Sequence, residues 1–170
     1  MSDPGQLPAK HPVSVLLAGP YGHPFHPVLV TVPIGAWVSS VVLDIAARVG
    51  HDTSALTLGA TWLLGIGLVG AVLAATVGFL DYLGIPSGTR AHRVALLHMV
   101  LNLTATALFL VALLLRLGDP SRTNTLAFVL ALVGLAGVGL SGTLGGELTF
   151  RYGVRVAAET DQAHGFTRPD

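Results

Sequence analysis

The sequence predicts an all-α protein, a transmembrane four-helix bundle. Of its 170 residues, 52% are hydrophobic and only 11% are charged, and the mean hydropathy is +0.71. Four apolar runs each reach the length of about 18 to 20 residues that a helix needs to cross a bilayer. A charge at the centre of such a helix costs roughly 2.5–3.5 kcal/mol, so the low charge content fits a chain that lies mostly in lipid.

Composition also excludes several classes of function. The chain has no cysteine, which excludes disulfides, thiolate metal sites, iron–sulfur clusters and covalent c-type haem. The formal net charge is zero without a basic block, so nucleic-acid binding has no electrostatic support. Residues 1–20 lack the pattern of a removable signal peptide. We expect an irregular or interfacial segment over 1–21, the transmembrane domain over 22–156 and a short tail over 157–170.

The stretch 22–27 reads Gly-His-Pro-Phe-His-Pro and opens the first predicted helix, about 27–49. A residue before proline avoids the α region, so His23 and His26 are expected to be extended. Pro27 suits the first position of a helix. Two imidazoles are therefore expected on a stiff segment at the mouth of this helix.

Three further residues shape the first helix. Pro33 removes the bond to the Leu29 carbonyl and predicts a kink, with Thr31 or a neighbouring helix as the new partner of that carbonyl. Asp44 lies four residues before Arg48, a spacing that favours an ion pair along the helix at the membrane interface.

The second predicted helix, about 55–80, and the fourth, about 125–145, carry small residues at intervals of four. Such residues let helix backbones approach closely in lipid, and the same gaps would leave room for a flat cofactor. They are Gly67, Gly70, Ala71, Ala74, Gly78, Gly137, Ser141 and Gly145.

The third predicted helix, about 91–117, opens among Arg90, His92 and Arg93 and carries His98 and Asn102 further in. His98 and Asn102 are four residues apart and share a face. His98 lies about two turns in, roughly 10 Å below the helix start, whereas His26 lies at a helix mouth. An ionisable residue at such depth faces the bundle interior and is a functional candidate.

Four spans place both termini and the loop between the second and third helices on one side. The basic residues of that side are Lys10, Arg90, Arg93, Arg151, Arg155 and Arg168; those of the other side are Arg48, Arg116 and Arg122. The positive-inside rule then predicts cytoplasmic termini in the cell inner (plasma) membrane.

The polar ends suggest two tandem helical hairpins. His26 precedes Asp81 by 55 residues, and His92 precedes Glu147 by the same interval. Duplicated units related by an axis along the membrane normal are known in membrane bundles.

Several segments resemble a bacterial family of predicted four-helix membrane proteins, domain of unknown function 2231. They are Gly22 to Pro27, Val32 to Gly35, Asp44, Gly78 to Tyr82, His98-x3-Asn102, and Gly145 to Val154, within about residues 20–156. Arg155 stands where the family favours a small residue, and Phe150-Arg151-Tyr152 replaces a pattern that often includes histidine. The resemblance implies no assigned activity; association with Rieske or cytochrome-like redox domains implies electron transfer.

The candidate site residues favour a b-type haem. His26 and His98 would be its axial ligands, with His23 beside them, Arg90 and Arg93 on the propionates and Asn102 orienting His98. Four-helix bundles hold such cofactors between facing helices.

Three alternatives stay open. A non-haem iron or zinc site would draw on histidine and carboxylate ligands: His23, His26, His98, Asp81 and Glu147. A proton or solute pathway would use the same ionisable groups. A structural or assembly subunit without cofactor would have Asp81 paired with Arg90 or Arg93, and Glu147 with Arg151. A homo-oligomer is compatible with each.

Overall fold

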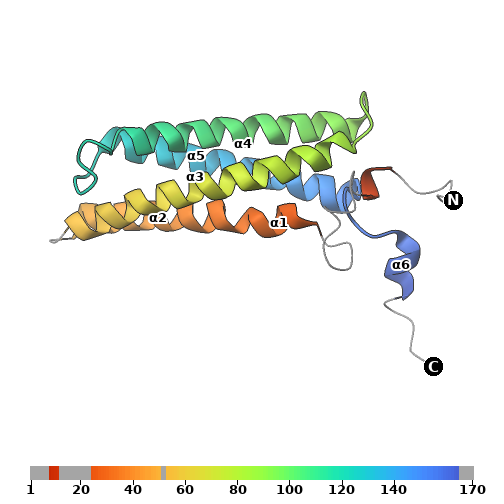
Figure 1. Cartoon of the computed structure of the whole chain (residues 1–170), viewed down its shortest axis with the longest axis horizontal. Helices are drawn as coiled ribbons and strands as arrows, with labels where there is room; N and C mark the ends of the chain where they lie inside the picture. Colours follow the sequence, from red (N-terminus) through yellow and green to blue (C-terminus); the bar gives the residue numbers. More distant parts are fainter. Residues whose placement is uncertain (1–7, 12–23, 51–52, 165–170) are drawn as a thin grey trace.

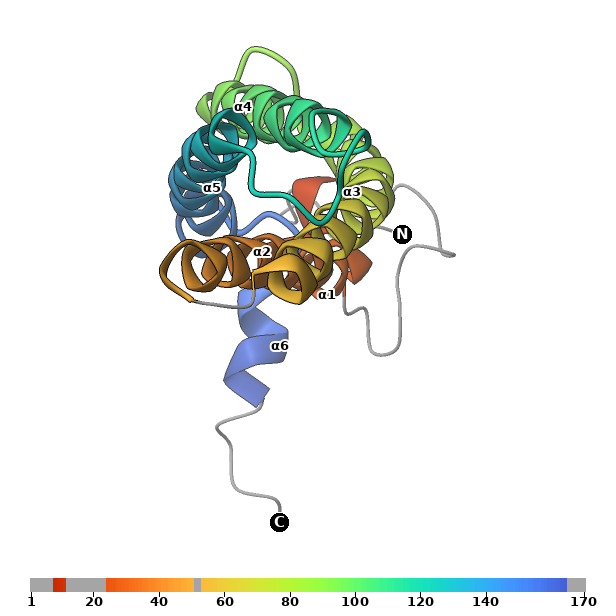
Figure 2. The ribbon, with the colours of Figure 1, turned by 90° about the vertical axis from the view of Figure 1, so that its left-hand side faces the viewer.

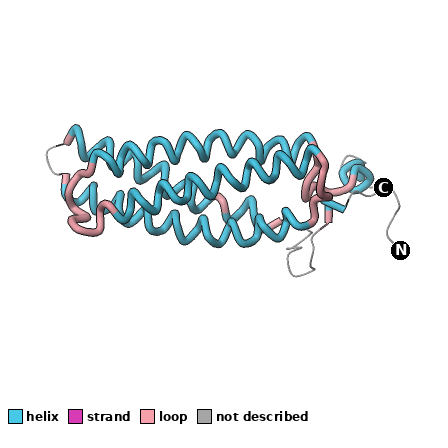
Figure 3. Tube along the Cα trace, turned by 90° about the horizontal axis from the view of Figure 1, so that it is seen from above, coloured by secondary structure: helices cyan, strands magenta, loops and turns pink. Residues whose placement is uncertain are grey.

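The computed structural model describes residues 8–11, 24–50 and 53–164, and in these ranges the regular structure is helical. The first span is α1 (Phe25–Leu29) followed by α2 (Thr31–Val49), and the second is α3 (Ser54–Leu83). The third is α4 (Arg90–Leu114), and the fourth is α5 (Thr125–Gly146) with the π-helix η4 (Glu147–Arg151). All four are long and apolar enough to cross a membrane. They lie side by side (Figure 1) with their connections at the two ends (Figure 3), so the predicted four-helix bundle is confirmed.

The outer surface of the bundle is apolar. Trp62, Val69 and Leu140 are each more than 60% exposed. A soluble monomer rarely exposes a large contiguous apolar surface, whereas lipid tails cover such side chains without cost. The bilayer is therefore the medium that this surface fits.

The first helix begins earlier than predicted. Pro24 is extended (φ −68°, ψ 137°) and α1 starts at Phe25, so His26 is helical rather than extended. Because the first N–H groups of a helix have no intrahelical partner, Pro27 removes no bond there. His23 lies outside the described residues, as do residues 12–22.

The helix is interrupted where the sequence predicts a kink, but the polar partner differs. The helix breaks at Val30, between α1 and α2. The Thr31 hydroxyl donates to the Val28 carbonyl at 2.7 Å rather than to the Leu29 carbonyl. The short η1 (Pro8–Lys10) and α6 (Glu159–His164) lie beyond the end of the bundle where α1 begins.

Seen along its axis, the bundle has the circular order α2, α3, α4, α5, so α2 lies opposite α4 and α3 opposite α5 (Figure 2). The opposite helices α2 and α4 fill the interior with large side chains. Trp37 of α2 stacks on Phe109 of α4, with 3.9 Å between the ring centroids. The helices α3 and α5 supply the room: Gly67 lies against Trp37, and Gly134 against Phe109.

The two hairpins, α1–α3 and α4–η4, repeat each other. Three residues of α1 and α2 meet counterparts that come 72 positions later, on α4 or in the turn just after it. These pairs are His26 with His98, Trp37 with Phe109, and Asp44 with Arg116. Equivalent glycines of α3 and α5 are 67 positions apart. Gly67 and Gly134 contact the two aromatic rings, and Gly78 and Gly145 contact the two imidazoles. The second hairpin is thus shorter by five residues between equivalent points.

This pseudo-two-fold arrangement supports the predicted tandem hairpins but corrects their register. The 55-residue spacing matched His26 with His92, whereas the structure places His98 opposite His26. The sequence pattern failed because the helices α4 and α1 begin at different distances from their inward-facing histidines.

Candidate functional site

Two imidazoles meet inside the bundle, near the end where α1 begins. His26 from α1 and His98 from α4 have ring centroids 6.3 Å apart and ring planes at 81°. Both residues are half-buried. The different depths expected from the sequence are not observed, because α4 starts further out than α1 and carries His98 to the level of His26.

Each imidazole is held by a main-chain carbonyl of a neighbouring helix. His26 Nδ1 lies 2.9 Å from the Ala74 carbonyl oxygen on α3. His98 Nδ1 lies 2.8 Å from the Ser141 carbonyl oxygen on α5. A carbonyl only accepts hydrogen bonds, so both Nδ1 atoms donate. In the neutral form of either ring, this leaves Nε2 as the unprotonated nitrogen.

Glycines make these contacts possible. A Cβ atom at Gly78 would lie 2.7 Å from His26 Cε1, and one at Gly145 would lie 3.2 Å from His98 Cε1. Each glycine comes four residues after the carbonyl that binds the imidazole. The predicted close packing of the small residues is confirmed here, and the space once assigned to a flat cofactor at Gly67, Gly70 and Gly78 is filled by side chains of α1 and α2.

His98 has the fuller set of polar partners. The Ser141 hydroxyl lies 2.9 Å from Nδ1 and donates to the His98 carbonyl at 3.1 Å. The Asn102 amide donates to Nε2 at 3.1 Å and to the His98 carbonyl at 3.0 Å. Asn102 thus shares a face with His98 as predicted, but it contacts the ring nitrogen that a metal would take. Ser141, which sequence reasoning treated only as a small residue, is the residue that orients the ring.

The two candidate carboxylates are occupied elsewhere. Asp81 lies 3.0 Å from Arg155 Nε, and both side chains are nearly buried. Glu147 pairs with Arg151 at 3.1 Å, as predicted, and accepts from the Tyr152 hydroxyl at 3.2 Å. Over the described ranges no three His, Asp or Glu side chains gather as a metal site. Asp81 was expected to pair with Arg90 or Arg93. This prediction is wrong, because its partner is Arg155.

Arg155 explains one departure from the family pattern. Its backbone is left-handed, with φ 58°, which favours glycine over a residue that has a Cβ. The same conformation directs the guanidinium to Asp81. Arg90 and Arg93 are exposed on the first turn of α4, at the same end of the bundle as the two imidazoles.

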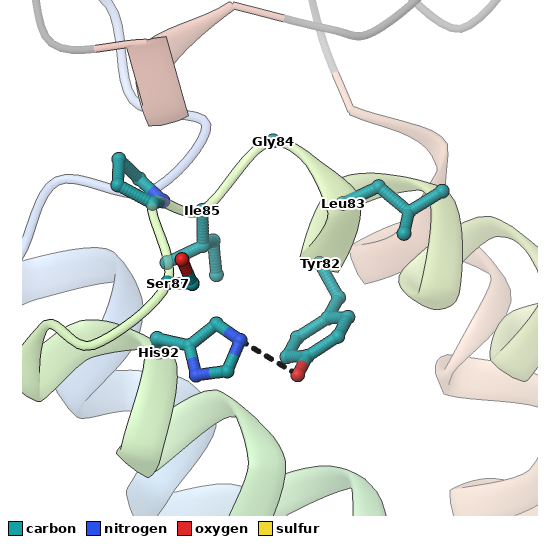
Figure 4. Close-up of a pocket in the computed structure, with 7 residues that line it drawn as sticks. Tyr82, Leu83, Gly84, Ile85, Ser87 and His92 are labelled. Carbon is teal, nitrogen blue, oxygen red and sulfur yellow. Dashed lines mark hydrogen bonds between the residues drawn. The ribbon is translucent and has the colours of Figure 1, made fainter.

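A second polar pair lines the turn between α3 and α4 (Figure 4). The Tyr82 hydroxyl lies 2.8 Å from His92 Nε2. These rings border an open cavity of about 470 Å³ that is otherwise lined by residues 83–87. His92 therefore serves this turn rather than the imidazole pair.

The other end of the bundle holds an ion pair that the sequence analysis missed. Asp44 is 0% exposed and Arg116 is 1% exposed. Arg116 Nη1 donates to Asp44 Oδ1 at 2.9 Å, and Nη2 contacts Oδ2. The predicted Arg48 contact exists at 3.8 Å, but Asp44 is buried rather than interfacial. The sequence places Arg116 near the end of the third predicted helix without a partner; its position 72 residues after Asp44 was the available signal.

The model of a family described as "Predicted membrane protein (DUF2231)" matches residues 22–158. No curated protein and no solved structure matches the chain.

Proposed function

We propose that this chain, which belongs to the DUF2231 family of predicted membrane proteins, binds a b-type haem through His26 and His98 and carries electrons in the plasma membrane. In this proposal both termini are cytoplasmic, and the electron partner is a redox domain of the Rieske or cytochrome kind, as the resemblance implies. The observation that supports this proposal is the close pair of imidazoles, in which each Nδ1 donates to a main-chain carbonyl.

The spacing of the rings would suit two imidazoles that hold one metal ion. An imidazole nitrogen lies about 2.0–2.1 Å from a bound zinc ion, so two imidazoles on opposite sides of a similar ion have centroids roughly 6–6.5 Å apart. The observed separation is 6.3 Å. Metal-binding histidines also donate their other ring N–H to a carbonyl or carboxylate, as both do here.

The remaining candidates have definite roles under this proposal. Haem would supply one-electron chemistry when bound; the chain would supply two imidazoles, each oriented by a main-chain carbonyl. Arg90 and Arg93, exposed at this end, would bind the propionates. The Asn102 amide would leave Nε2 and keep its bond to the His98 carbonyl.

A structural or assembly role is the second candidate, and a specific observation favours it. Both ring nitrogens of His98 already have protein partners, Ser141 and Asn102, so the ring needs no ligand to be satisfied. A non-haem metal would find two imidazoles but no third ligand among the described residues.

Visible spectroscopy separates these candidates. The protein is purified in detergent, titrated with haemin to replace cofactor lost during expression, and reduced with dithionite. We expect a Soret band and a sharp reduced α-band at one haem per chain. His26→Ala and His98→Ala should each abolish the low-spin spectrum, whereas His92→Ala, at the Tyr82 turn, should keep it.

Other outcomes contradict the haem proposal. A protein that stays colourless after titration but holds stoichiometric iron or zinc by elemental analysis has a non-haem site. One that is colourless and metal-free, yet folded, has the structural role. Haem that binds equally well to the His26→Ala and His98→Ala variants would have other ligands.

A further inference from the structure

We infer that the two hairpins are copies of one self-associating unit, and that the buried Asp44–Arg116 pair makes each hairpin select the unlike hairpin as its partner. The inference concerns the inner face of each hairpin, α1–α3 or α4–η4, and what can cover it. It does not depend on haem.

The first step is that equivalent residues face each other. In a two-fold dimer, residues near the axis contact their own counterparts. Here His26 faces His98, Trp37 stacks on Phe109 and Asp44 pairs with Arg116. These contacts occur at three levels from one end of the bundle to the other, so the axis runs along the helices.

The second step is that only one of these three contacts, the ion pair, joins residues of different chemical type from the two hairpins. The histidine level and the aromatic level would persist if two copies of the same hairpin associated. The third level would not, because two first hairpins would bring Asp44 against Asp44, and two second hairpins would bring Arg116 against Arg116.

The third step is the cost of that mismatch. Both side chains are at most 1% exposed. Asp44 lies within a candidate membrane span, and Arg116 lies in the turn just after α4. A buried charge that lacks its counterion is strongly destabilising. Repulsion between like partners is a common device for specificity. The partner that fits each hairpin is therefore the unlike hairpin, from the same chain or from a second copy.

Charge exchange in the full-length protein tests this. Asp44→Arg and Arg116→Asp are each expected to lower the melting temperature in detergent by on the order of 10 °C. The double variant should recover part of that loss, because the pair is restored but Arg48, which lies 3.8 Å from Asp44, would then lie beside an arginine. Arg122→Asp, an exposed charge reversal at the same end, should change little. A double variant no more stable than the single variants would overturn the inference.

Co-expression of the two single variants tests partner choice. The first hairpin of Asp44→Arg complements the second hairpin of Arg116→Asp, and the reverse combination is also complementary. Differently tagged chains should therefore form a hairpin-exchanged dimer with restored melting temperature, absent when either variant is expressed alone. Mixed chains that remain as unstable as each alone, without co-purification of the two tags, would show that charge does not select the hairpin.

Discussion

The indole of Trp37 stacks on the ring of Phe109 at an interplanar angle of 12°, in the middle of the bundle and between the two polar levels. Trp37 is 3% exposed and Phe109 is 0% exposed. The stack fits only because glycines of α3 and α5 line its sides. The stack between the two hairpins therefore depends on a glycine within each hairpin.

Gly67→Ala is expected to destabilise the protein by about 1–3 kcal/mol, the usual cost of overpacking a core. Its added Cβ would overlap the Trp37 indole. Unfolding by a denaturing detergent, followed by circular dichroism, measures the change. Gly139→Ala is the matched control, since nothing lies within 4 Å of that position; equal losses for the two variants would contradict this packing.

Gly78→Ala is expected to reduce haem binding more than Gly145→Ala. The new methyl would lie 2.7 Å from the His26 ring but 3.2 Å from the His98 ring, so His26 must move away from the Ala74 carbonyl. Haem content per chain is read from the reduced spectrum. Gly142→Ala, which meets nothing within 4 Å, should bind haem normally, and a matching loss there would point to a general helix effect.

Asn102→Ala should raise haemin affinity while lowering the stability of the haem-free protein. The amide occupies His98 Nε2 at 3.1 Å, so its removal frees the ligand atom. The loss of this bond should cost about 0.5–1.5 kcal/mol, the net contribution of a typical intramolecular hydrogen bond. Haemin titration and detergent unfolding report the two effects separately; weaker haemin binding would argue against the assignment of Nε2.

Asp44→Asn should cost about 3–5 kcal/mol, because the Arg116 guanidinium stays buried without its counterion. Asp119→Asn makes the same chemical change on an exposed residue at the same end and should stay within about 0.5 kcal/mol of wild type. Detergent unfolding compares them. Similar small effects would mean that water reaches Arg116.

Arg155→Ala and Arg155→Gly both remove the contact with Asp81, but they differ at the backbone. At φ 58° a Cβ costs about 1–2 kcal/mol, which glycine relieves. The glycine variant should therefore be the more stable of the two by about 1 kcal/mol. Thermal unfolding in detergent measures the difference, and a more stable alanine variant would refute the strain.

Much of the fold could be read directly from the order of residues. Transfer of a helix into lipid depends on the summed hydropathy of neighbouring residues, so the four spans and the break before Pro33 followed from local composition. The same reasoning singled out His26 and His98 and the pairing of Glu147 with Arg151, which is local along one helix.

Contacts between helices depended on the tertiary structure. The relative depth of His26 and His98 follows from where α1 and α4 begin with respect to each other, and no local pattern encodes that. Asp44 has one partner four residues away and a closer one 72 residues away. Arg155 reaches Asp81 through a backbone conformation that its residue type disfavours.

The sequence by itself thus determined that the chain has four helices apolar and long enough to cross a membrane, and which polar residues they carry. Only the tertiary structure decided which of these residues touch. The physical reason is that insertion free energy adds up along the chain, whereas packing free energy depends on side-chain shape and charge across a two-fold axis that joins residues far apart in sequence.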